Sequence, residues 1–138
     1  QEPAARTLQT SRTQVVIVDI VLFQPKHDIT QAEREAFAST LQRTVHAIPE
    51  VQRARVGSGI QVGVGYEAKL GRPPYDFVAL LEFATLQDLR TYLDHPLHEA
   101  LGMMFWQTCE STMILDADVV DAADADLVEF LTGSPTER

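Results

Sequence analysis

The stretch Thr91-Tyr92-Leu93-Asp94-His95-Pro96-Leu97-His98-Glu99-Ala100-Leu101 holds two of the four histidines of the chain, a tyrosine and a proline. Proline lacks a backbone N–H and has a fixed φ, so it is tolerated in the first turn of a helix but breaks a helix interior. We therefore predict a short helix over residues 86–93 and a second helix that begins at Pro96. Asp94 or His95 is expected to cap the second helix.

Tyr92 and His98 stand on either side of this break, so we expect them to lie close together. His95 and His98 are three residues apart, which makes them neighbours on the helix surface. The second helix is predicted to bury one apolar stripe made of Leu97, Leu101 and Met104. Any chemistry on a small molecule is expected at this break.

The bulk composition indicates one folded domain. The chain has 138 residues, 45% of them hydrophobic, and a formal net charge of −9. A strongly acidic chain is a poor ligand for nucleic acid or an anionic membrane surface, because both need clustered Lys and Arg. The sequence contains no apolar run of the roughly 18 residues that a membrane-spanning helix needs. We expect neither nucleic acid nor membrane as a partner.

We expect no metal ion and no cofactor. Cys109 is the one cysteine, so an intrachain disulfide and a thiolate cage are both impossible, and we interpret it as a small core residue. A metal site would need a third ligand beside His95 and His98. The five aspartates between residues 116 and 126 lack the central Gly and terminal Glu of a calcium loop.

The chain divides into a polar lead over residues 1–14, one domain over residues 15–120, and an acidic tail over residues 121–138 with a short helix. The lead has no hydrophobic period and is interpreted as flexible. The chain begins Gln1-Glu2-Pro3-Ala4-Ala5 without a methionine, as a chain does after removal of a leader. Export to the periplasm or the extracellular space is therefore one hypothesis, and the cytoplasm is the other.

Four strands are predicted, over residues 15–23, 51–62, 75–83 and 112–120. The first is apolar on both faces, which indicates that both faces are covered. In the second, Gly57-Ser58-Gly59 suggests a bulge or bend. Asp19 interrupts the first strand, on the same face as Ile17, Val21 and Phe23.

Further helices are predicted from capping residues and hydrophobic spacing. Thr30 with Glu33 forms a capping box in front of a helix that Pro49 stops. Residues 63–74 are interpreted as a loop. Their Gly-x-Gly is only a weak match to a phosphate-binding loop, because no helix is expected after it, and we do not interpret it as one. In the tail, residues 127–131 form a short helix that Gly133 ends, and its apolar side chains are expected to be buried on a sheet edge or a partner chain.

This order predicts an α+β fold, a ferredoxin-like βαββαβ sandwich with a four-stranded antiparallel sheet, helices on one face and an extra C-terminal helix. The other face of the sheet also needs cover, because Val16, Val18, Ile20 and Leu22 point to it. Two sheets packed about a two-fold axis would supply that cover. We therefore expect a homodimer that forms a dimeric α+β barrel.

The sequence resembles the stress-responsive A/B barrel domain (Dabb) family of dimeric α+β barrels, over roughly residues 15–120. The matching pieces are Asp19-Ile20-Val21-Leu22-Phe23-Gln24, Ala47-Ile48-Pro49-Glu50-Val51, Tyr75-Asp76-Phe77, Tyr92-Leu93-Asp94-His95-Pro96-Leu97-His98 and Leu115-Asp116.

A plant polyketide cyclase of this family catalyses an aldol condensation without a cofactor, using a histidine base and a tyrosine. The resemblance assigns these roles to His98 and Tyr92. Other family positions differ: Asp19 replaces a first-strand histidine, Leu41 a tyrosine, Phe77 a histidine and Gln24 a lysine. The resemblance also implies a role connected with stress.

Three functions stay open. The first is an apolar pocket that binds a small hydrophobic ligand, lined by Ile17, Val21, Phe77, Ala79, Leu81 and His95. The second is a cyclase-like enzyme, or another lyase or isomerase, that uses His98 and Tyr92 with Asp19. The third is a structural or regulatory dimer. A lone buried carboxyl at Asp19 needs a partner, so we expect a hydrogen bond from His98 or Tyr92 that raises the pKa of His98 and lowers that of Asp19.

Overall fold

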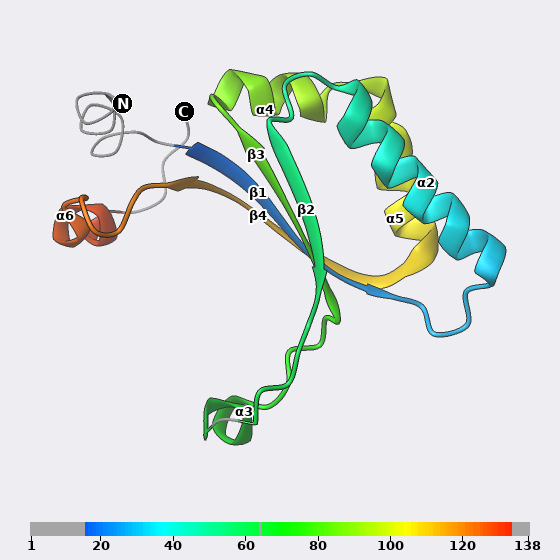
Figure 1. The fold of residues 1–138 in the computed structure, drawn as a ribbon, viewed down its shortest axis with the longest axis horizontal. Helices are drawn as coiled ribbons and strands as arrows, with labels where there is room; N and C mark the ends of the chain where they lie inside the picture. Colours follow the sequence, from blue (N-terminus) through cyan, green and yellow to red (C-terminus); the bar gives the residue numbers. More distant parts are fainter. Residues whose placement is uncertain (1–15, 64, 134–138) are drawn as a thin grey trace, which may run out of the picture.

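The computed structural model describes residues 16–63 and 65–133, so the predicted lead over residues 1–14 lies outside the described residues. The elements follow in the order β1 (Val16–Pro25), α2 (Gln31–Ala47), β2 (Arg53–Ser58), α3 (Gly65–Leu70), β3 (Phe77–Phe83), α4 (Leu86–Leu93), α5 (Pro96–Thr108), β4 (Cys109–Val119) and α6 (Leu127–Thr132). The strands form an antiparallel sheet in the order β2-β3-β1-β4. Helices α2, α4 and α5 cover one face of it (Figure 1). The chain therefore has the predicted ferredoxin-like α+β fold with an extra C-terminal helix.

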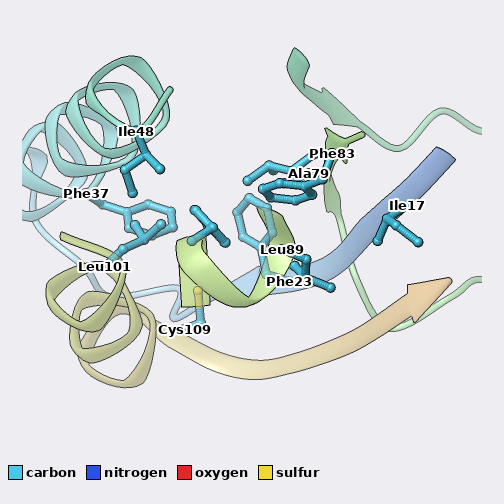
Figure 2. Packing of buried hydrophobic residues seen from close by; sticks show 11 residues of the cluster. Ile17, Phe23, Phe37, Ile48, Ala79, Phe83, Leu89, Leu101 and Cys109 are labelled. Atoms are coloured by element: carbon cyan, nitrogen blue, oxygen red, sulfur yellow. The ribbon is translucent and has the colours of Figure 1, made fainter. Parts of the chain in front are cut away.

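The core lies between the sheet and the three covering helices. Every second residue of β1 and β3 points toward the helices, and Phe83, at the end of β3, is fully buried in this layer. Phe37 of α2 and Leu101 of α5 approach the sheet side chains from the opposite side (Figure 2). Around the far end of β1, the ring of Phe23 contacts three others at centroid distances of 5.3 to 5.8 Å: Phe37, Phe77 and Phe105.

Local signals set the helix starts as predicted. Thr30 and Glu33 form both hydrogen bonds of the capping box at α2. Thr85 caps α4, and His95, rather than Asp94, caps α5 by accepting a hydrogen bond at Nδ1 from the Leu97 amide at 3.0 Å. Asp94 instead ends α4. The break at Pro96 therefore separates two helices, as its ring requires.

Two predictions about the β2–β3 connection were wrong. Strand β2 ends at Ser58 instead of residue 62, and it pairs with β3 in unbroken register, so the glycines mark the end of the strand and not a bulge. The loop predicted over residues 63–74 contains the six-residue helix α3. The Glu67 carboxylate supports its start by accepting hydrogen bonds from the Val62 and Gly63 amides, both at 2.8 Å. Gly71, at a φ of 79° that favours glycine, follows its last residue.

The ends of the other strands also differ from prediction. β1 runs two residues further, to Pro25, where a register shift against β4 accommodates the proline. β4 begins at Cys109 and not at Thr112. β3 begins at Phe77, because the Gln24 side chain takes up the hydrogen bonds of Asp76. The Asp76 amide donates to Gln24 Oε1 at 2.7 Å, and its carboxylate accepts from Gln24 Nε2 at 3.1 Å.

The face of the sheet away from α2, α4 and α5 is apolar and uncovered within one chain. β1 presents Val16, Val18, Ile20 and Leu22 there, as expected from its pattern. On the neighbouring strand β4, Met113 is 53% exposed and Leu115 is 60% exposed. Such a contiguous apolar surface is costly to leave in water.

Helix α6 lies beyond the ends of β1 and β4, away from the three covering helices (Figure 1). Its apolar side chains were expected to be buried, and within one chain this is wrong: Val128 is 77% exposed and Leu131 is 76% exposed. The short helix has no sheet surface of its own to pack on. Across residues 16–63 and 65–133, no helix is both long enough and apolar enough to cross a membrane.

Candidate functional site

The α4–α5 break brings Tyr92 and His98 together, as predicted. Tyr92 lies in the last turn of α4 and His98 in the first turn of α5, and their ring centroids are 4.7 Å apart. The Tyr92 ring also packs on Phe83, with ring centroids 5.2 Å apart. Tyr92 is therefore fixed between the core and the histidine, which leaves its ring little freedom.

A hydrogen bond to the backbone of α4 orients the His98 ring. Its Nδ1 atom lies 3.1 Å from the carbonyl oxygen of Leu93. Because a carbonyl oxygen only accepts hydrogen bonds, Nδ1 carries the proton and Nε2 is the basic nitrogen of the neutral ring. Burial lowers the pKa of His98, against the opposing effects of the Leu93 hydrogen bond and the charge of Asp116. His98 is thus a neutral imidazole at pH 7.

Asp19 and Asp116 face each other across the β1–β4 ladder as direct cross-strand partners. Asp19 is only 4% exposed, whereas Asp116, in the outer strand, is exposed. Their carboxyl groups interact, and a hydrogen bond between them would require a shared proton because two carboxylates only accept. Burial, the charge of Asp116 and this hydrogen bond raise the pKa of Asp19 from its ordinary 3.8 to about 7. Burial also raises the pKa of Asp116.

The predicted pairing of Asp19 with His98 or Tyr92 was therefore wrong. The pKa of Asp19 rises and that of His98 falls, opposite to both expected directions. The reason is that a second carboxyl group occupies the cross-strand position next to Asp19. The two carboxyl groups also affect Tyr92. Burial, and then the charges of Asp19 and Asp116, raise the pKa of its hydroxyl well above its usual range.

A cavity of about 510 Å³ opens onto these four groups, between the sheet and helices α4 and α5. Its polar lining residues are Asp19, Tyr92, His98, Cys109, Glu110, Ser111, Thr112 and Asp116. The other lining residues are Val21, Leu93, Leu101, Gly102, Phe105, Trp106 and Ile114. Volume and lining are typical of sites for small organic molecules, which combine apolar walls with a few convergent polar groups.

Of the residues predicted to bind a ligand, only Val21 lines this cavity. Ile17, Ala79 and Leu81 are buried in the core, and Phe77 packs against it. The Nδ1 atom of His95 is used as the cap of α5. The cavity was predicted over β1 and β3, but it lies nearer β4. Residues of α5 and β4 line it, whereas the inward side chains of β3 are buried in the hydrophobic core.

Asp116 is the main residue that the sequence interpretation missed. The sequence places it in a family-matching piece and in a rejected calcium loop, but not in the site, although the last strand carries an inward aspartate between apolar residues, as the first strand does. In the described part of the chain, no group of three or more His, Cys, Asp or Glu side chains is placed to hold a metal ion. Burial raises the pKa of the Cys109 thiol.

Comparisons with known proteins agree with this architecture. Residues 17–119 match the model of the stress responsive A/B barrel domain. A Dabb family protein with a ferredoxin-like fold from Mesorhizobium loti is 25% identical, with 75% of this chain and 96% of that chain covered and a TM-score of 0.59. A comparison with curated proteins found no match.

Two further solved structures are similar in fold. A dimeric ferredoxin-like protein of unknown function from Thermobifida fusca is 21% identical, with 78% of this chain and 94% of that chain covered and a TM-score of 0.59. A hydroxynitrile lyase from Passiflora edulis is 14% identical, with 75% and 93% covered and a TM-score of 0.62.

The carboxyl pair predicts a specific pH dependence of stability. Between about pH 4 and pH 7 the folded chain keeps a proton on Asp19 that the unfolded chain has lost, so the free energy of unfolding should fall as pH rises. In Asp19→Asn the free energy of unfolding should fall less with pH, because Asn cannot ionise. At pH 8, where Asp19 is ionised, the variant should therefore be the more stable protein, by on the order of a few kcal/mol. Urea unfolding at several pH values measures the difference. Parallel pH profiles for both proteins would contradict a proton held by Asp19.

Proposed function

Since the chain belongs to the stress responsive A/B barrel domain family, we propose that it binds a small, largely apolar molecule in the cavity beside α4 and α5. The observation that carries this proposal is a cavity of about 510 Å³ whose lining combines apolar side chains with the groups Asp19, Asp116, Tyr92 and His98. An apolar body would contact Leu101, Phe105 and Ile114, while a polar end would lie against the carboxyl pair, Tyr92 and His98. Burial of the apolar body supplies affinity at about 25 cal/mol per Å².

A cavity-filling variant tests ligand binding. A side chain added at Gly102, which lines the cavity, meets no atom within 4 Å of its Cβ. We expect Gly102→Phe to fold, to occupy the cavity and to weaken binding of the neutral fluorescent probe N-phenyl-1-naphthylamine by at least tenfold. Ala100→Phe, an exposed position on the same helix, is the matched control and should bind like wild type. Equal affinity of Gly102→Phe and Ala100→Phe would contradict binding in this cavity.

A second candidate function, proton-transfer catalysis on the bound molecule, is favoured by the state of His98. A neutral imidazole with Nδ1 tied to Leu93 presents Nε2 as a general base near pH 7. Tyr92 beside it would hydrogen-bond an oxygen of the substrate. Reactions open to such a pair include loss of a proton from a hydroxyl group, as in cyanohydrin cleavage, and from a carbon next to a carbonyl, as in aldol cyclisation of a polyketone.

Turnover assays test this second candidate. Wild type should cleave mandelonitrile or cyclise a linear polyketone, and His98→Ala should lose about 100-fold or more in kcat, the usual contribution of a general base. The control His46→Ala removes an exposed histidine at the end of α2 and should retain full activity. Wild-type protein without turnover of either substrate class, yet competent in probe binding, would leave ligand binding as the function and exclude these reactions.

The proposed assembly is a two-fold homodimer in which the uncovered sheet faces pack together. Its support is the apolar face formed by Ile20, Leu22, Leu80, Met113 and Leu115, together with the Thermobifida fusca protein of the same fold, which is described as dimeric. Burial of this face would offset the cost of exposing it to water. This assembly also leaves the cavity accessible, because the cavity lies on the helix side of the sheet.

A single charge placed in that face should separate the copies. Leu115→Glu and Met103→Glu alter side chains of similar exposure in one chain, 60% and 57%, on the sheet face and on α5 respectively. We expect Leu115→Glu to sediment as a monomer at micromolar concentration, because the interface would bury an unpaired charge, and Met103→Glu to remain dimeric. Wild type that sediments as a monomer would refute the dimer.

A further inference from the structure

The charge of the cavity lining points to one class of occupant. Three of its side chains are acidic, Asp19, Glu110 and Asp116, and among the residues that line it none is Lys or Arg. His98 adds no positive charge at pH 7, because burial lowers its pKa. The whole chain carries a formal net charge of −9, which concentrates cations near its surface.

Asp19 also has unused hydrogen-bonding capacity. Its Oδ1 atom is buried and has no hydrogen-bond partner among the described residues, while the side chain as a whole is 4% exposed and lines the cavity. A buried carboxyl oxygen without a partner costs about 1–3 kcal/mol. The aligned partner Asp116 cannot relieve this cost, since a second carboxyl brings at most the one shared proton.

We propose that the natural occupant of the cavity carries a protonated amine that binds Asp19 and Asp116, with its apolar body against Leu101, Phe105 and Ile114. This rests on the ligand-binding function proposed above and names the chemical class of the ligand. An ammonium group donates several hydrogen bonds and carries the positive charge that the two carboxyls lack. A neutral hydroxyl would satisfy one oxygen without compensating the second carboxylate, and an anionic ligand would be repelled.

Proton release should accompany amine binding. The groups that face the carboxyl of Asp19 are Asp116 from β4, Tyr92 from α4 and His98 from α5. Of these, the carboxyl pair holds the exchangeable proton near neutral pH, because the pKa of Asp19 is raised to about 7. An ammonium ion favours the fully ionised pair, so binding should expel the shared proton, and amine affinity should rise with pH between about 6 and 8.

Calorimetric titration of the full chain with three matched probes tests this ligand class. The probes are 3-phenylpropylamine, 3-phenylpropan-1-ol and 3-phenylpropanoate, which share one apolar body and differ in the charge of the end group. At pH 8 we expect the amine to bind at least tenfold more tightly than the alcohol, and the carboxylate to bind more weakly than both. Repeating the titration in buffers of different ionisation enthalpy at pH 7 should reveal net proton release with the amine alone.

Charge-removing variants locate the amine. Asp116→Asn should weaken amine binding at least tenfold and change alcohol binding less than threefold, whereas the remote control Asp28→Asn removes the same charge from an exposed loop and should leave both affinities unchanged. Alcohol binding equal to or tighter than amine binding would overturn the amine while leaving the cavity as a ligand site. Wild type that binds neither probe would overturn the binding function as well. The pH and buffer dependence of wild type decides the question even if Asp116→Asn fails to fold.

Discussion

Burial of the Asp19 carboxyl under the helices is the constraint around which the site is arranged. β1 lies inside the sheet, so its inward face is covered by the helical layer, and a side chain there loses contact with water. The antiparallel register then puts Asp116 directly opposite. Burial disfavours the charged form of Asp19 and the charge of Asp116 adds to this, so the pair retains a proton that isolated aspartates would lose near pH 4.

The groups around the carboxyl pair are also held in their neutral forms. Tyr92 stays protonated because burial and the negative charges of Asp19 and Asp116 both oppose a phenolate. The Nδ1–H of His98 donates to the Leu93 carbonyl, which leaves Nε2 as the base of the site. The cavity therefore combines hydrogen-bond donors, one neutral base and excess negative charge within apolar walls. Such a cavity favours a ligand with an apolar body and a hydrogen-bond donor at one end.

Much of the fold could be predicted from local chemistry. The capping box at Thr30, the break at Pro96 and the two-sided apolar pattern of β1 each act through neighbouring residues, and each appears in the structure. The pairing of Asp19 with Asp116 could not be predicted, because it depends on the register between strands at opposite ends of the domain. Helix α3 was missed for a different reason: it lies in a glycine-rich segment that favours a loop, and Glu67 supports its start by accepting hydrogen bonds from the Val62 and Gly63 amides.

The site prediction failed where it treated the inward sheet face as one surface. The inward side chains of β3 pack into the hydrophobic core, and the cavity lies instead between α5 and β4.

The behaviour of the site depends on one proton that Asp19 and Asp116 share near neutral pH. Carbon-13 NMR of the two aspartate carboxyl carbons across pH 3 to 9 tests it most directly. We predict that one of the pair's titration steps lies near pH 7 and is sensed by both carbons. Two independent titrations, both complete below pH 5, would contradict the account.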